Sequence, residues 1–182
     1  MKSVQVLAVV CITLLLAACS KEGTHVDSYF YASVNGPSWN GEFRIQARNM
    51  EEFPAQAVIS PSGDPAIPDV LIMTYNDMVE NLSVSIIIPA EKRLTELTDD
   101  HEVFGMGIVN GVNTSETIDL ISKTLSMHVT KLNTRSGGFA GLNIPSEVFG
   151  NFEGVMIHER WDNGVRIEES HTVKGDFKFY QE

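Results

Sequence analysis

The stretch that decides the fold is residues 153–173, which read EGVMIHERWDNGVRIEESHTV. Two runs with strand-forming residues, Glu153–Trp161 and Val165–Val173, flank a short Asp-Asn-Gly segment at residues 162–164. Asn-Gly segments are typical of tight hairpin turns, because they accept the positive φ angles that such turns require. The stretch therefore predicts a β-hairpin.

Alternation of apolar and polar residues extends this pattern along the chain. Phe43, Ile45 and Ala47 alternate with polar residues in Glu42–Arg48, and Leu82–Ile88 alternates in the same way. A period of two is typical of strands with one buried face. Similar runs predict strands at residues 29–34, 55–60, 70–75, 103–109, 117–121, 124–132, 139–144 and 176–180.

These strands predict an all-β fold. About nine to eleven strands at close spacing are typical of a single antiparallel β-sandwich or of a partly open barrel, and both remain open. Residues 90–101 are the only stretch in which we expect a short helix. Residues 27–182 have the length of one domain, and we assign them to a single β-sandwich-type domain.

The first residues have the features of an export signal. Lys2 precedes an apolar run from Val4 to Leu16, which is shorter than the about 20 residues needed to span a bilayer. The run closes with Leu16-Ala17-Ala18-Cys19, which resembles the lipobox of bacterial lipoproteins. This resemblance implies a cleaved signal peptide over residues 1–18, lipid on Cys19 and a lipidated tether over residues 19–26. An ordinary secretory signal without a role for Cys19 is the alternative.

The residues after Cys19 bear on the destination. The sequence Ser20-Lys21-Glu22-Gly23 has no Asp next to the cysteine, and the resemblance to lipoprotein sorting signals then implies the outer membrane. The same residues partly resemble a signal that sends lipoproteins to the cell surface. The sequence leaves open whether the protein faces the periplasm or the exterior of the cell envelope.

Composition excludes several classes of partner and site. The chain has 13 Lys and Arg against 24 Asp and Glu, for a net charge of −11. An acidic surface repels phosphate, so we do not expect nucleic acid as a partner. Cys11 would leave with the signal and Cys19 would carry lipid, which leaves no cysteine for a disulfide or a thiolate metal site. We expect no cofactor.

Four motifs carry a family resemblance. They are Val-Asn-Gly-Pro-Ser-Trp at residues 34–39, Leu-Ser-Met-His-Val-Thr-Lys-Leu at residues 125–132, Gly-Gly-Phe at residues 137–139 and Gly-Asp-Phe at residues 175–177. With them the chain resembles small, uncharacterised bacterial lipoproteins over most of residues 27–180. The resemblance implies an antiparallel β-sandwich or barrel and carries no assigned activity.

Trp161, Asp162 and Asn163 form the candidate ligand site, because they lie at the predicted hairpin turn. An exposed indole there could stack on a sugar ring. The chain's other tryptophan, Trp39, belongs to the strand-opening motif, so we expect it in the core.

Asp99, Asp100, His101 and Glu102 are weak candidates for a metal site. Hard cations such as Ca²⁺ prefer oxygen ligands, which three carboxylates supply. The glycine spacing of an EF-hand loop is missing, so solvation of a loop is the simpler interpretation.

Glu169 and His171 share their strand parity with Val165, Ile167 and Val173, which should face the core. A buried glutamate and histidine need partners. Three interpretations stay open: a functional site, a β-bulge that changes the parity, and a strand end that has left the core.

The function class follows from the anchor and the strand pattern. We expect a membrane-anchored envelope lipoprotein that acts as a non-catalytic binding or structural module, with an envelope protein or a glycan as its partner. A carbohydrate-binding module is one alternative. A hydrolase or metal-dependent enzyme is another, with residues that converge only in the folded chain, because the sequence has no Gly-x-Ser-x-Gly motif.

Replacing Cys19 with Ala tests the lipid anchor. The variant should be released from membranes or should retain its signal peptide, because a single thiol would carry the acyl chains. Membrane fractionation with mass spectrometry of the amino terminus measures both outcomes. A processed Cys19→Ala protein that still fractionates with membranes would contradict the assignment.

Overall fold

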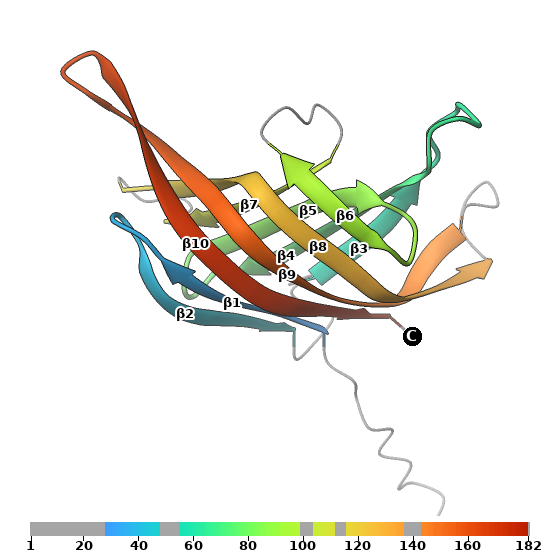
Figure 1. Ribbon diagram of the computed structural model, residues 1–182. Helices are drawn as coiled ribbons and strands as arrows, with labels where there is room; N and C mark the ends of the chain where they lie inside the picture. The colour runs from blue at the N-terminus through green and yellow to red at the C-terminus, as the bar shows by residue number, and fades with distance from the viewer. Residues whose placement is uncertain (1–27, 48–54, 99–103, 112–115, 137–142, 182) are drawn as a thin grey trace, which may run out of the picture.

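The computed structural model describes residues 28–47, 55–98, 104–111, 116–136 and 143–181. These residues form ten strands in one antiparallel sheet that curls into a half-barrel (Figure 1). The all-β prediction is confirmed, and the partly open barrel is the alternative that the chain adopts. The strands are β1 (Ser28–Asn35), β2 (Asn40–Ala47), β3 (Ala55–Ser60), β4 (Val70–Asp77), β5 (Leu82–Pro89), β6 (Leu94–Thr98), β7 (Gly105–Asn110), β8 (Ile118–Ser136), β9 (Asn143–Asp162) and β10 (Val165–Tyr180).

The strand order is β2-β1-β10-β9-β8-β7-β5-β4-β3, and β6 pairs with β8 beside this path. Neighbours in the order are not always neighbours in sequence. β1 pairs along its length with β10, from Tyr29 opposite Lys178 to Asn35 opposite Thr172. The first and the last strand of the described chain therefore lie side by side, between β2 on one side and β9 on the other.

Alternation of burial follows the alternation in the sequence. In β5 the core-facing residues Leu82, Val84, Ile86 and Ile88 are each at most 6% exposed, as their spacing predicts. Each fully buried aliphatic side chain of this size contributes about 1.5–3 kcal/mol by leaving water. The hydrophobic effect thus fixes which face of each strand turns inward.

Aromatic rings fill the interior of the half-barrel near β1. Phe30 stacks on Phe43 and on Phe152, with ring centroids 6.0 Å and 5.3 Å apart. Trp39 continues this row by stacking on Phe43 at 5.1 Å, which agrees with the core role expected for it. Tyr75 of β4 contacts Phe30 from the opposite side of the core at 5.7 Å, and burial raises the pKa of its hydroxyl.

The short helix expected within residues 90–101 is wrong over the residues that the structure describes there. Leu94–Thr98 forms β6, which pairs with β8 from His128 to Thr124. Thr95 and Leu97 are buried while Leu94 and Glu96 are exposed, so the burial period is two. Pairing with β8 gives this short segment its backbone partners.

Three predicted boundaries inside the long strands are also wrong. The sequence pattern ends a strand at residues 122–123, but β8 runs continuously through them. It also places a boundary at residues 174–175, and β10 runs continuously through those. β9 includes residues 145–152, for which the sequence pattern predicts no strand. A register shift at residues 122–124 of β8 lets that strand bend without ending.

Glycines allow these long strands to pack closely. A Cβ on Gly175 would lie 2.0 Å from the carbonyl oxygen of Tyr31 and 2.6 Å from the ring of Phe152. A Cβ on Gly150 would lie 2.2 Å from the ring of Phe177. Contacts with neighbouring strands therefore leave no room for a side chain at Gly150 or Gly175. Glycine by itself weakens a strand.

The Gly175→Ala substitution should therefore lower the free energy of unfolding by about 1–3 kcal/mol, because backbone atoms on β1 would have to move. Gly41→Ala is the matched control in an edge strand, where a Cβ meets nothing within 4 Å. Its effect should stay within about 0.5 kcal/mol. Urea unfolding followed by circular dichroism measures both, and equal effects would contradict the packing described.

Candidate functional site

β9 and β10 continue beyond the rest of the sheet as a two-stranded ribbon (Figure 1). β8 last pairs with β9 at Ile157, and β1 last pairs with β10 at Thr172. Beyond these residues the two strands pair with each other and with no further described strand. We call residues 158–171 the arm.

The arm ends in the turn that the sequence predicts. Asn163 and Gly164 have φ angles of +50° and +82°. Asp162 and Val165 form the last pair on either side of them, so the connection has two residues. Two consecutive positive φ angles match the twist of the flanking strands, which is why Asn-Gly occurs here.

Ion pairs cross the arm on both of its faces. On one face Arg166 binds Glu159 and lies 3.4 Å from Glu168. Glu168 also binds Lys123 of β8 at 2.6 Å, which connects the arm to the body. On the other face Arg160 Nε donates to Glu169 Oε1 at 2.7 Å. An isolated two-stranded ribbon is marginally stable, so these cross-strand pairs help to hold its shape.

The tip of the arm exposes two large apolar side chains. Trp161 is 71% exposed and Val165 is 64% exposed. Trp161 pairs with Arg166 and Val165 pairs with Asp162, so the two apolar side chains lie on opposite faces of the ribbon. The tip therefore presents apolar surface on both sides.

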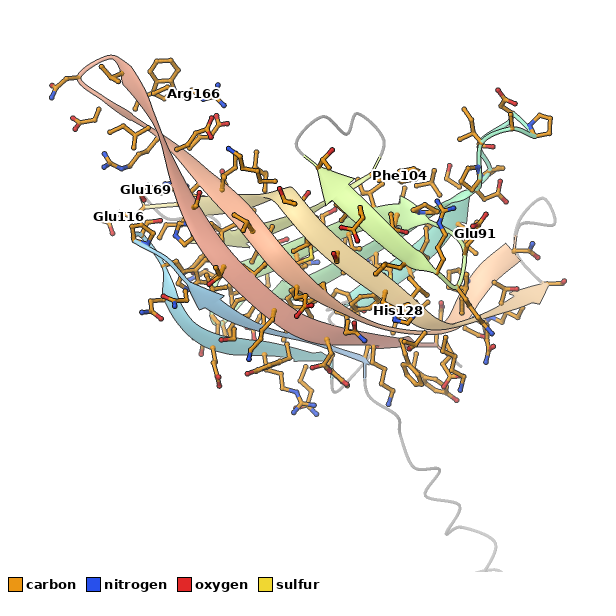
Figure 2. The ribbon with its side chains drawn as sticks, in the orientation of Figure 1. Glu91, Phe104, Glu116, His128, Arg166 and Glu169 are labelled. Carbon is orange, nitrogen blue, oxygen red and sulfur yellow. The ribbon has the colours of Figure 1, made fainter. Side chains whose placement is uncertain are left out.

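The predicted ligand residues Trp161, Asp162 and Asn163 lie together at this tip, and all three are exposed. Asn163 Nδ2 donates to Asp162 Oδ1 at 3.0 Å, and Arg160 Nη1 lies 4.0 Å from Asp162 Oδ2. Their arrangement is a projecting end of a ribbon, as the position of Arg166 in Figure 2 also indicates.

The base of the arm contains Glu169 and His171, the two polar residues that alternation places on the core-facing side of the strand. His171 is fully buried, and the Glu169 side chain is 14% exposed. The pairing of β9 with β10 is continuous here, so a β-bulge is wrong as an explanation. Glu169 instead lies where β10 leaves the core, and His171 lies inside it.

Ser38 is the partner of His171. Ser38 lies in the turn between β1 and β2, and its Oγ is 2.9 Å from His171 Nε2. The other ring nitrogen, Nδ1, is 3.0 Å from the carbonyl oxygen of Glu169. The imidazole is therefore hydrogen-bonded at both nitrogens, which satisfies a buried polar ring.

Gly36 makes room for this ring. A Cβ on Gly36 would lie 2.1 Å from His171 Cδ2. The glycine of the Val34-Asn35-Gly36 motif is thus required by a contact with a residue far along the chain. In the sequence, Gly36 and Ser38 stood out only as members of the motif at residues 34–39 that carries the family resemblance.

Arg160 controls the charge of Glu169. Its hydrogen bond holds the pKa of the Glu169 carboxyl below its usual range, against the effect of partial burial, and the Ser38 hydroxyl lowers this pKa further. Glu169 Oε2 is buried and has no well-oriented hydrogen-bond donor among the described residues. Ser38, His171, Glu169 and Arg160 form one polar group, which we call the base cluster.

A separate polar groove of about 800 Å³ lies over the opposite face of the sheet. Ser33 of β1 lines it together with Glu153 and Lys174, which are directly paired across β9 and β10. Ser33 is partly buried like Ser38 but lies on the face opposite to the core.

The remaining sequence candidates lie outside the described residues. This holds for Cys19 and for the weak metal candidates Asp99, Asp100, His101 and Glu102. Within the described ranges, no three His, Cys, Asp or Glu residues are placed to hold a metal ion. The same ranges contain no helix long and apolar enough to cross a membrane.

The ion pairs of the arm predict a pH dependence of stability. Lys123 lowers the pKa of Glu168, and Arg160 lowers that of Glu169. Because both folded-state values are depressed, their stabilisation is present above the ordinary pKa of glutamate and is lost as the pH falls through the lowered values.

Between about pH 6 and pH 3 the melting temperature of the Glu168→Gln/Glu169→Gln double variant should fall less than that of the wild type. Thermal unfolding at several pH values measures this difference. Glu147, whose pKa Lys131 also lowers, is present in both proteins and serves as the internal reference. Parallel pH profiles for the two proteins would contradict the contribution of the arm.

The chain matches no protein-family model, no curated protein and no solved structure.

Proposed function

We propose that this protein is a lipid-anchored binding module of the bacterial envelope that engages a partner protein with its arm. The proposed anchor is lipid on Cys19, at the end of the Leu16–Cys19 segment that resembles a lipobox. The outer membrane is the proposed location.

The observation that carries the proposal is the exposure of Trp161 and Val165 on opposite faces of the arm tip. Exposed apolar side chains on both sides of a ribbon favour insertion into a cleft, where both faces become buried. A sugar ring stacks on one aromatic face and would leave Val165 in water. Tryptophan and arginine are also among the residues most enriched where binding energy concentrates in protein interfaces.

The rigidity of the arm supports the same function. Its arginines are already paired with carboxylates, and the base cluster fixes β10 to the turn between β1 and β2. A binding element that is ordered before contact loses less conformational entropy on association. The arm therefore needs no folding step to meet a partner.

The position of the arm relative to the start of the domain suits a partner away from the anchoring membrane. Ser28, the first described residue, bonds to Tyr180 at one end of β10, whereas the arm lies at the other end. The 16 residues of β10 span about 50 Å at about 3.3 Å per residue. Measured along the strand, the tip of the arm is thus separated by the length of β10 from the point where the chain enters the domain.

The experiment is capture of the partner by the lipidated protein in envelopes of the producing bacterium, followed by mass spectrometry. The double variant Trp161→Ala/Val165→Asp should reduce capture at least about tenfold, because interface residues of this kind contribute more than about 1 kcal/mol each. Val79→Asp is the matched control, since Val79 is 86% exposed at the turn between β4 and β5.

Capture that depends on the arm but not on Val79 supports the proposal. Equal capture by the arm variant and the wild type would exclude the arm as the contact surface. Recovery of a glycan in place of a protein would replace the proposal with the carbohydrate-binding alternative.

A further inference from the structure

We propose that Ser38 is a nucleophile activated by His171, and that the base cluster cleaves carboxylic esters. This activity goes beyond the binding function of the arm and rests on different atoms. Its starting point is the 2.9 Å distance between Ser38 Oγ and His171 Nε2. A nucleophile within hydrogen-bond reach of a base, with the base oriented by a third group, is the signature of covalent catalysis.

The hydrogen bonds determine which nitrogen of His171 acts as the base. The carbonyl oxygen of Glu169, 3.0 Å from Nδ1, can only accept a hydrogen bond. In the neutral imidazole Nδ1 must therefore be the protonated nitrogen, and Nε2 must carry the lone pair. When the Ser38 hydroxyl turns its one proton from the Glu169 carboxylate to Nε2, it has the arrangement needed for proton removal.

His171 is more deeply buried than Ser38, and catalysis needs an enclosed base beside a more accessible nucleophile. His171 is fully buried, with its ring against Gly36, so its orientation is fixed by packing. Ser38 is only partly buried, so the proposed nucleophile belongs to a residue that reaches the surface while the base is enclosed. Arg160 binds the neighbouring Glu169 carboxylate, which compensates its negative charge beside the reacting centre.

The proposed reaction has two balanced steps. Ser38 Oγ forms a bond to the ester carbonyl carbon while its proton passes to His171 Nε2, and this proton then passes to the departing alcohol as the carbon–oxygen bond breaks. Water next attacks the acyl-serine, gives a proton to Nε2 and releases the carboxylic acid, and Ser38 recovers its proton.

Esters are the expected class of substrate because the group that orients His171 is the backbone carbonyl of Glu169. A carboxylate on Nδ1 would stabilise the imidazolium more strongly, as in enzymes that cleave amides. A carbonyl dipole orients the ring but gives weaker stabilisation, so a better leaving group is required. Alcohols leave more readily than amines.

The first test uses a fluorophosphonate probe on the full-length lipoprotein in detergent, with the modified residue identified by mass spectrometry. Ser38 should be labelled, and Ser38→Ala should abolish the adduct. The matched control is Ser33→Ala, because Ser33 is also partly buried but lines the polar groove on the opposite face. Labelling at Ser38 that Ser33→Ala preserves supports the proposal, whereas no adduct at Ser38 overturns it.

A second measurement leaves the fully buried His171 unchanged. A thiol beside a base ionises more readily, so Ser38→Cys should react with iodoacetamide near pH 6 at least about tenfold faster than Ser33→Cys. Equal rates would show that His171 does not activate position 38. Neither measurement involves the partner of the arm, so the two proposals can fail separately.

Discussion

The unbroken pairing between β9 and β10 is the interaction on which the rest of the structure depends. It runs without a register shift from Glu147 opposite Tyr180 to Asp162 opposite Val165. Because a slip by one residue would turn every side chain to the other face, this continuity fixes the side-chain rows of both strands. One such row changes from Phe177 inside the core, through His171, to Glu169 at its margin. The polar cluster is thus the place where a single row of side chains passes from apolar to aqueous surroundings.

Local sequence pattern was sufficient for most of the fold. Alternation predicted the inward face of β5, and the Asn163-Gly164 pair predicted the turn of the longest hairpin. The local pattern failed where tertiary contacts decide whether a strand continues. Gly150 and Gly175 weaken a strand locally, but each is covered by an aromatic ring from a neighbouring strand, and the strands continue through them.

The candidate site was predictable only in part. The position of Trp161 at an exposed turn followed from the hairpin, and the inward parity of His171 followed from alternation. The contact with Ser38 did not, because the two residues are separated by 133 positions and meet through the order of strands in the sheet. Gly36 was the one local indication of this contact in the sequence. The need for a glycine there is explained only by the ring of His171, which packs against it.

The pairing of β1 with β10 has a consequence for the order of folding. Ser28 and Tyr180 are bonded across 152 positions of sequence, so β1, which pairs with β2 on one side, gains its second partner only after nearly the whole described chain is available. Contacts of such long range slow folding, because much chain entropy is lost before they form. During folding, β1 and β2 therefore pair only with each other until β10 is available. The sheet is thus completed at this end only in the final stage of folding.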